Sequence, residues 1–356
     1  MVTLQDIQQK LKAGERLSLE DGRALFESTD ILTIGRMAQD VRERLHGRRA
    51  FYAVNLHLNP TNICSTRCEF CAFSRDAGAL DAYALTLDEI EKKVRTAVEQ
   101  FQINEVHIVG GHNPALGFDY YLEMLRRLRR IDSKIFIKAF SAPEIDDMAK
   151  RAGISWEEVL TQLKGAGLSG MPGGGAEIFD PEVRAKLCPG KISGEEWLGV
   201  HRTAHGLGIK TNATLLYGHI ETAVHRVAHL LKLRDLQDET GGFSAFVPLA
   251  YHPQNNALKG ARETTGFLDL KMISISRLLL DNIPHIKAHG SATNLKFIQA
   301  ALSFGADDMG GTNLQERVMH EAGSRSPEGL GAADLVRCIR DAGYTPCRVD
   351  SSYSIA

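Results

Sequence analysis

Apolar residues recur at helical spacing through the first 46 positions of the chain. Leu4, Ile7 and Leu11 fall on one face of a helix. The segment "SLED" at 18–21 has the pattern of a capping box before the apolar run "RALF". A second apolar face ends at Gly47 and comprises Ile31, Ile34, Met37, Val41 and Leu45. We therefore expect an N-terminal helical extension over residues 1–48.

From residue 51 the pattern changes to short apolar runs that alternate with amphipathic segments. The candidate strands are 52–58, 105–110, 134–140, 167–171, 209–216, 243–249, 285–288 and 306–310. This repeated strand–helix alternation favours an α/β fold, a (β/α)8 TIM-type barrel over 49–320. A doubly wound open sheet is the alternative. Residues 321–356 are expected to form a C-terminal helix and a tail that pack on the barrel.

Composition and charge exclude several classes of function. The chain has 356 residues, 42 basic and 44 acidic, and a formal net charge of −2. This balance predicts that the protein binds neither nucleic acid nor an anionic membrane surface. The N-terminus lacks the apolar run of a signal peptide, and no stretch approaches the roughly 20 apolar residues of a membrane span. We expect a cytoplasmic protein, whose six cysteines are thiols or metal ligands rather than disulfides.

Half of the cysteines lie together in "NPTNICSTRCEFCAFSR", directly after the first candidate strand. In a barrel this loop lies at the catalytic mouth. A structural zinc site needs four protein ligands, whereas Cys64, Cys68 and Cys71 are followed by no fourth cysteine nearby. Three thiolates can hold three irons of a 4Fe–4S cluster and leave the fourth iron open. A zinc site and incidental thiols are the alternatives. The scattered Cys188, Cys338 and Cys347 are expected to be ordinary core or surface thiols.

The spacing C-x3-C-x2-C, with Phe70 before the last cysteine, resembles the radical S-adenosylmethionine (SAM) superfamily. The resemblance implies that the amine and carboxylate of SAM bind the open iron. Gly110 and Gly111, followed by His112, occupy the place of the superfamily's Gly-Gly-Glu turn, whose backbone carbonyls receive the methionine amine. Only this backbone role carries over, because His112 replaces the glutamate.

Further residues match SAM contacts of relatives such as biotin synthase. Glu177 in "GGGAEIF" stands where those relatives place an acidic ribose ligand. Lys191 in "CPGK" falls where they place a cation for the methionine carboxylate, although a surface lysine is an equal alternative. In "TLLYGHIE" Leu216 is implied to contact adenine. This motif matches at Gly218 and Glu221 and departs at Thr214, where glycine is usual.

The resemblance narrows to the menaquinone/deazaflavin branch of the superfamily. It rests on "HLNPTNICSTRCEFCAF", "IVGGHNP", "KAFSAPEI", "CPGKISGEEWL" and "FVPLAYHPQNN". Among the families of that branch, the chain most resembles the aminofutalosine synthases. Dehypoxanthine futalosine cyclase and a component of deazaflavin (F0) synthase are the alternatives.

The resemblance implies that a 5′-deoxyadenosyl radical, formed after one electron reaches the cluster, adds to the enol ether of 3-[(1-carboxyvinyl)oxy]benzoate. The implied product is 6-amino-6-deoxyfutalosine, a menaquinone precursor. SAM would be a co-substrate, and flavodoxin or ferredoxin a suitable electron donor.

An aryl dicarboxylate substrate needs polar groups at the strand ends. We expect Asn55, His57, His112 and His252 to act in catalysis. The wider candidates are Lys138, His219, His289 and Arg75. A metal-dependent hydrolase is a different-class alternative, but its usual His-x-His is replaced by Asn-Leu-His at 55–57. A non-catalytic electron carrier is disfavoured, because ferredoxins close their clusters with four cysteines.

Overall fold

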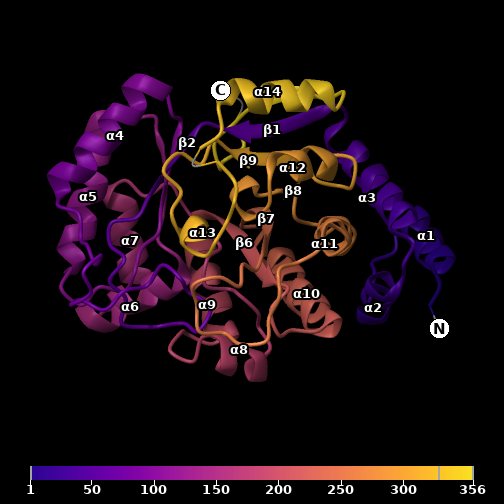
Figure 1. The fold of residues 1–356 in the computed structure, drawn as a ribbon, viewed down its shortest axis with the longest axis horizontal. Coiled ribbons are helices and arrows are strands. Elements are labelled where there is room, and N and C mark those ends of the chain that lie inside the picture. The colour runs from indigo at the N-terminus through magenta and orange to yellow at the C-terminus, as the bar shows by residue number, and fades with distance from the viewer. Residues whose placement is uncertain (1, 328, 355–356) are drawn as a thin grey trace.

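The computed structural model describes residues 2–327 and 329–354 (Figure 1). The helices are α1 (Leu4–Ala13), α2 (Leu19–Glu27), α3 (Ile31–His46), α4 (Leu87–Phe101), α5 (Phe118–Ile131), α6 (Ala142–Ala152), α7 (Trp156–Ala166), α8 (Pro181–Leu187), α9 (Gly194–Gly206), α10 (Ala223–Thr240), α11 (Gly266–Leu279), α12 (Leu295–Ala301), α13 (Val318–Glu321) and α14 (Ala332–Asp341). The strands are β1 (Arg49–Ala53), β2 (Asn55–Leu58), β3 (Glu105–Ile108), β4 (Phe136–Ala139), β5 (Gly170–Met171), β6 (Lys210–Tyr217), β7 (Phe243–Ala250), β8 (His285–Ile286), β9 (Asp308–Gly311) and β10 (Thr345–Arg348).

The helical N-terminus is confirmed. The Ser18 hydroxyl accepts from the Asp21 backbone N–H, and the Asp21 carboxylate accepts from the Ser18 N–H, which is the predicted capping box. Helix α3 ends at His46 and is followed by Gly47, whose positive φ of 57° suits glycine. Helix α3 packs along α11, and α2 packs against α10. The extension therefore covers one side of the strand region, as Figure 1 shows.

Parallel strands β2 to β8 form one curved sheet in sequence order. Segment 308–314 joins its two edges. The Ala288 N–H donates to the Asp308 carbonyl, and the His57 N–H donates to the Leu314 carbonyl. Each predicted strand coincides with an observed one, although β5 and β8 are only two residues long. The predicted α/β barrel fold is confirmed, with its last strand attached by isolated bridges at both edges.

Two details of the sequence-based prediction were wrong. The first predicted strand divides at Val54 into β1 and β2, and only β2 joins the barrel sheet. The C-terminal tail contains β10, which pairs in parallel with β1 in a separate sheet of order β10-β1-β9. The sequence "TPCR" of β10 is short, partly exposed and interrupted by proline, so it carries no alternating apolar signal.

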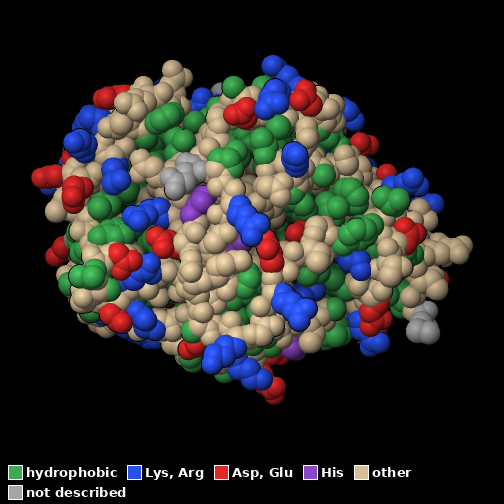
Figure 2. Space-filling view, in the orientation of Figure 1, with side chains coloured by type: hydrophobic (Ala, Val, Ile, Leu, Met, Phe, Trp, Pro, Cys, Tyr) green, Lys and Arg blue, Asp and Glu red, His purple; other side chains and the backbone are tan. Residues whose placement is uncertain are grey.

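One hydrophobic core joins the N-terminal, barrel and C-terminal segments. It includes Ile7 and Ile34 of the extension, Leu56 and Val106 of the barrel, and Ile339 of α14, all fully buried. No helix in the described ranges is long and apolar enough to cross a membrane. Figure 2 shows basic and acidic side chains interspersed on one face of the molecule, in line with the balanced charge of the chain.

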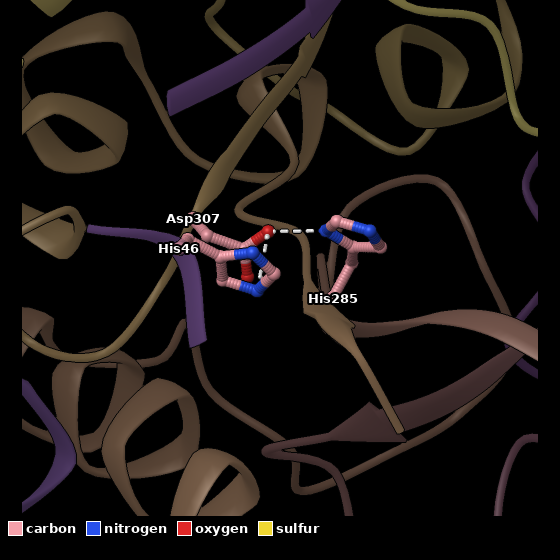
Figure 3. A group of neighbouring side chains, drawn as sticks. All are labelled: His46, His285 and Asp307. Atoms are coloured by element: carbon pink, nitrogen blue, oxygen red, sulfur yellow. Dashed lines mark hydrogen bonds and ion pairs between the residues drawn. The ribbon is translucent and has the colours of Figure 1, made fainter. Parts of the chain in front are cut away.

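At the N-terminal ends of β8 and β9 lies a buried cluster of His46, His285 and Asp307 (Figure 3). His285 Nδ1 donates to Asp307 Oδ2 at 2.5 Å, and His46 Nε2 donates to the Pro284 carbonyl at 2.8 Å. The other Asp307 oxygen accepts from the Arg277 guanidinium. Because these polar groups already bond one another, the cluster is explained as an ion-pair network that fastens α3 and α11 to the barrel.

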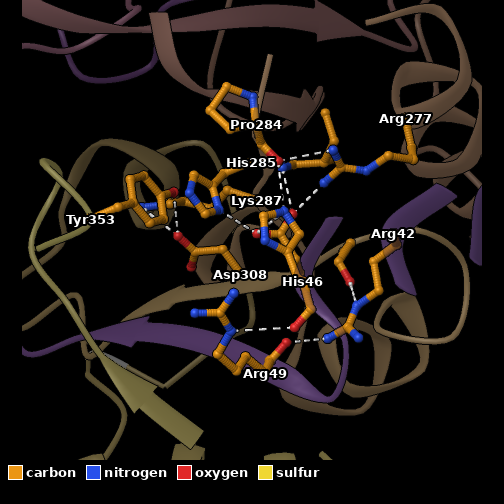
Figure 4. Close-up of polar contacts among 12 residues, drawn as sticks. Arg42, His46, Arg49, Arg277, Pro284, His285, Lys287, Asp308 and Tyr353 are labelled. Atoms are coloured by element: carbon orange, nitrogen blue, oxygen red, sulfur yellow. Dashed lines mark hydrogen bonds and ion pairs between the residues drawn. The ribbon is translucent and has the colours of Figure 1, made fainter. Parts of the chain in front are cut away.

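Tyr353 and its neighbours extend this network across the same end of the barrel (Figure 4). The Tyr353 ring stacks on His285 at 3.5 Å between centroids, and its hydroxyl donates to Asp308 Oδ2 at 2.6 Å. The Ser351 N–H donates to Glu105 Oε2 at 2.8 Å. We call this end, covered by residues 349–353, the barrel floor.

Candidate active site

The cysteine loop connects β2 with α4 and is held at several points by backbone hydrogen bonds. The Cys64 N–H donates to the Arg75 carbonyl at 3.1 Å, and the Glu69 N–H donates to the Leu187 carbonyl at 3.1 Å. Cys64, Cys68 and Cys71 are free and partly exposed. The loop follows the C-terminal end of β2 and so lies at the barrel mouth, as predicted.

Gly111 lets this loop lie directly on the turn after β3. A Cβ atom at this position would lie 2.1 Å from the Ile63 carbonyl oxygen and 3.0 Å from Cys64 Cβ. The neighbouring Gly110 N–H donates to Glu144 Oε1 at 3.0 Å. Burial raises the pKa of Glu144 to about 7, against the effect of its hydrogen bonds from Ser141. The turn is therefore fixed against both the cysteine loop and the first turn of α6.

A cavity runs from the cysteine loop into the barrel. Its apolar lining includes Phe70, Phe73, Val109, Leu216, Val247 and Leu249. One polar group of lining residues lies by the loop: Cys71, Gly110, Glu177 and Lys191. A second polar group comes from the barrel strands and from the segments after β8 and β9: Asn55, His57, His107, Lys138, Asn212, Lys287, His289, Asn313 and Glu316. The cavity is thus apolar along part of its wall and carries two separate sets of polar side chains.

Glu177 and Lys191, predicted separately, form one buried ion pair. Lys191 Nζ lies 2.5 Å from Glu177 Oε1 and 5.1 Å from the centre of the Phe70 ring. Burial alone would lower the pKa of Lys191, but the nearby Cys68 and Glu177 raise it overall. The pKa of Glu177 is lowered, since Lys191 outweighs the effect of burial. Both groups are therefore charged at neutral pH and face the cavity beside the cysteine loop.

The motif around the end of β6 divides into two parts. Leu216 lines the cavity, and its N–H donates to the Glu177 carbonyl at 2.9 Å. Glu221 instead accepts from the Gly218 and His219 N–H groups at 2.7 and 2.9 Å and pairs with Arg226. Gly218 has a φ of 90°, which suits glycine at this turn. Glu221 therefore stabilises the turn that presents Leu216.

The predicted catalytic residues lie in different surroundings. Asn55 and His57 line the cavity. His112 lies behind the cysteine loop, where its Nδ1 is 2.8 Å from Thr66 Oγ1. His252 Nε2 donates to the Ala292 carbonyl at 3.1 Å. Neither His112 nor His252 belongs to the cavity lining.

The wider candidates divide in the same way. Lys138 and His289 line the cavity. His219 Nε2 donates to the Leu216 carbonyl at 3.0 Å and so turns toward the backbone. Arg75 pairs with Asp81 at 2.6 Å and with Glu321 of α13 at 3.2 Å, which joins the cysteine loop to the segment after β9.

Several cavity residues were absent from the sequence-based prediction. His107 stacks on His57 with 4.6 Å between ring centroids, and Lys287 and Glu316 also face the cavity. His107 and Lys287 belong to strands whose positions were predicted, so the alternation of inward and outward residues could have identified them. Glu316 lies in an irregular loop and carries no such signal.

The residues by the loop fit a cluster with a SAM ligand. In the described ranges, the His46 group is the only set of three or more histidine, cysteine or acidic residues whose ligand atoms all lie within 4.8 Å of one another. The three thiols are therefore too far apart to bind one and the same ion. In an iron–sulfur cube each thiol binds a different iron, so a wider spacing of the thiols is needed. The adjoining ion pair offers one anion and one cation, which suits a ligand with hydroxyl groups and a carboxylate.

Comparison with known proteins agrees with this geometry. Residues 58–233 match the model of the radical SAM superfamily, and residues 240–356 match that of the CofH/MqnC C-terminal region. The chain belongs to the radical SAM superfamily of enzymes.

Curated relatives place the chain within that superfamily. It is 44% identical to the aminodeoxyfutalosine synthase of Thermus thermophilus, over 98% of this chain and 94% of the relative. It is 41% identical to the aminodeoxyfutalosine synthase of Streptomyces coelicolor, over 98% of this chain and 93% of the relative. A 5-amino-6-(D-ribitylamino)uracil–L-tyrosine 4-hydroxyphenyl transferase of Archaeoglobus fulgidus is 42% identical, over 90% of this chain and 92% of the relative. The predicted branch of the superfamily is confirmed.

Solved structures confirm the fold alone. Methylornithine synthase (PylB) superposes with a TM-score of 0.77 at 18% identity, over 97% of this chain and 98% of the other. The FeFe-hydrogenase maturase HydG of Carboxydothermus hydrogenoformans also gives 0.77 at 18% identity, over 98% and 80%.

Proposed function

We propose that this enzyme is an aminodeoxyfutalosine synthase, which forms 6-amino-6-deoxyfutalosine for menaquinone biosynthesis. The observation that carries the proposal is the 44% identity to the Thermus thermophilus enzyme over 98% of the chain. The segments "GGHNP", "KAFSAPE" and "FVPLAYHPQNN" support the same choice. The transferases represent a competing activity, because one of them is 42% identical to this chain.

The cluster and SAM supply, when bound, a 5′-deoxyadenosyl radical for addition to the enol ether of 3-[(1-carboxyvinyl)oxy]benzoate. The task of the chain is to bind and orient both substrates and to exclude water. Cys64, Cys68 and Cys71 would hold the cluster at the mouth. The apolar walls of the cavity would shield the reacting carbon atoms from side reactions.

The ion pair beside the loop is suited to SAM. Glu177 would accept from the ribose hydroxyls, and Lys191 would donate to the methionine carboxylate. The turn at Gly110 and Gly111 would offer its backbone carbonyls to the methionine amine. Phe70 and Leu216, on the apolar wall, would contact the adenosyl group.

Asn55 and His57 line the cavity and are suited to contact the aryl substrate. Burial lowers the pKa of His57, so the neutral ring can donate one hydrogen bond and accept another. For His112 and His252 we propose supporting roles. His112 would hold the cysteine loop through Thr66, and His252 would hold the segment at Ala292.

The reaction needs one electron from outside the chain, for which flavodoxin or ferredoxin has suitable chemistry. We propose a cytoplasmic location, where six free thiols and an oxygen-sensitive cluster would persist.

The test is an anaerobic assay of reconstituted enzyme with reductant, the enol-ether benzoate and SAM labelled with ¹³C in the adenosyl group. Mass spectrometry should find the label in a product that also contains the benzoate. Labelled 5′-deoxyadenosine alone, together with turnover of L-tyrosine and 5-amino-6-(D-ribitylamino)uracil, would assign the chain to the transferases instead. Turnover of a futalosine-type substrate would assign it to the cyclases.

A further inference from the structure

Two buried lysines face the inner part of the cavity from different sides of the barrel, since β5, β6 and β7 lie between their strands in the sheet. Lys138 on β4 and Lys287 after β8 both line it. Their carboxylate partners do not. Lys138 Nζ lies 2.7 Å from Glu105 Oε1, and Lys287 Nζ lies 3.2 Å from Asp308 Oδ2. The cations are therefore presented to the cavity while the anions lie outside its lining.

The anions are held in that position by the barrel floor. Glu105 Oε2 accepts from the Ser351 N–H at 2.8 Å, and Asp308 Oδ2 accepts from the Tyr353 hydroxyl at 2.6 Å. The Ser351 hydroxyl also accepts from Lys138 Nζ at 2.8 Å. The C-terminal tail thus fixes both carboxylates and leaves the lysine ammonium groups directed inward.

Each lysine retains hydrogen-bonding capacity. An ammonium group has three N–H donors. Among the described residues, Lys138 contacts Glu105 and Ser351, and Lys287 contacts Asp308. At least one donor of Lys138 and two of Lys287 therefore remain for a ligand. Both residues are buried, so such bonds would form away from bulk water.

A third polar atom lies in the same part of the cavity. His289 lines it, and its buried Nδ1 has no hydrogen-bond partner in the described part of the chain. Burial lowers the pKa of His289 to about 3, and the nearby His57 and Lys287 contribute. The ring is neutral and can donate one hydrogen bond. A buried polar atom without a partner is costly, and a bound ligand would satisfy it.

Glu316 also lines the cavity, and its carboxylate would repel a bound anion unless another group balances its charge. Its carboxylate bonds His320 at 2.7 Å, and this contact raises the pKa of His320 to about 9. The negative charge of Glu316 is therefore balanced at neutral pH. The three cations and three carboxylates then cancel, so an anion would be held by the remaining N–H donors of Lys138 and Lys287 rather than by a net positive charge.

We propose that Lys138, Lys287 and His289 form the subsite that binds the benzoate carboxylate of the aryl substrate. The assignment rests on the proposed function for the identity of the substrate. It makes the two lysines and His289 specificity-determining residues, and it makes Ser351 and Tyr353 positioning residues that act through Glu105 and Asp308.

The orientation of the substrate follows from the place of the chemistry. The alkene carbon must come within about 3–3.5 Å of the adenosyl 5′ carbon, and the residues suited to SAM lie by the cysteine loop. The carboxyvinyl group then points toward the loop. The benzoate carboxylate, at the opposite end of the molecule, points inward to Lys138 and Lys287.

The test compares two ligands that differ only in this carboxylate. Calorimetry should show that 3-methoxybenzoate binds the wild-type enzyme at least tenfold more tightly than methoxybenzene. Lys287→Met should reduce binding of 3-methoxybenzoate at least tenfold and leave methoxybenzene within twofold. The same contrast is expected in kcat/KM for the enol-ether benzoate and for 2-phenoxyacrylate, which lacks the benzoate carboxylate.

Two further variants keep the test decisive. Lys138→Met leaves Glu105 buried without its partner, so Lys138→Met/Glu105→Gln removes both charges together and should show the same selective loss. Lys12→Met, on the exposed surface of α1, is the matched control and should change the affinity for neither ligand. SAM affinity and cluster absorbance should stay unchanged in all of them.

Equal affinity of the wild type for both methoxy ligands, or an equal loss of both in Lys287→Met, would overturn the subsite. This result does not depend on turnover. Failure to convert the enol-ether benzoate would instead overturn the proposed function, while selective benzoate binding would still support the subsite.

Discussion

Lys191 Nζ lies 2.5 Å from Glu177 Oε1, although the two residues come from different segments on either side of α8. We propose that each contacts a different part of SAM. A charge-assisted hydrogen bond contributes about 1.5–3 kcal/mol, which corresponds to roughly a tenfold or greater change in affinity. Glu177→Gln should therefore weaken SAM binding at least tenfold, as measured by equilibrium dialysis of the reconstituted enzyme.

Lys191→Met should have a similar effect on SAM affinity and should leave the visible absorbance of the cluster unchanged. Glu182→Gln and Lys186→Met, on the exposed face of the same α8 region, provide charge-matched controls. If SAM binds Glu177→Gln and Lys191→Met with wild-type affinity, the ion pair does not belong to the SAM site.

The three loop cysteines should be individually required for the cluster. Alanine at position 64, 68 or 71 should abolish the visible absorbance and SAM cleavage after anaerobic reconstitution, because each thiolate would hold one iron of the proposed cluster. Cys188 is the most demanding control, because it is buried and adjoins Leu187, which bonds the loop. Cys188→Ala should retain the cluster. If the single substitution Cys188→Ala also abolished the cluster, the three-thiolate site would be contradicted.

Gly111→Ala should disturb the cysteine loop without removing a ligand. The added Cβ would meet the Ile63 carbonyl oxygen at 2.1 Å, so the backbone must move. Overpacking of this kind costs about 1–3 kcal/mol of folding stability. We expect lower iron content and a lower Tm. Gly78→Ala, in the same connection but with open space around it, should match the wild type in both measurements.

The Glu316–His320 pair should make stability depend on pH above neutrality. The hydrogen bond to Glu316 raises the pKa of His320 from 6.5 to about 9. Its stabilising contribution is therefore complete below pH 6.5 and is lost as the pH rises through about 9. The Tm difference between wild type and His320→Gln should shrink from pH 6.5 to pH 9.5. A constant difference over that range would show that the pair is not coupled in this way.

The barrel could be predicted because its strands are apolar runs separated by amphipathic segments. The cysteine loop could be predicted because its three cysteines lie close together in the sequence. The pairing of Lys138 with Glu105 could not, since each appears in sequence as a lone charge within a strand. Only the parallel register of β3 and β4 brings them together. Similarly, nothing local distinguishes Tyr353 from a residue of a solvated tail, although it stacks on His285.

The barrel floor has a consequence for the order in which ligands bind. Residues 349–353 cover the end of the barrel opposite the cysteine loop, so a ligand would enter at the mouth, where that loop lies. SAM, if held by Glu177 and Lys191, would occupy this route. An aryl substrate that reaches Lys138 must then arrive before SAM, and steady-state kinetics would be sequential and ordered, with the aryl acid as the leading substrate.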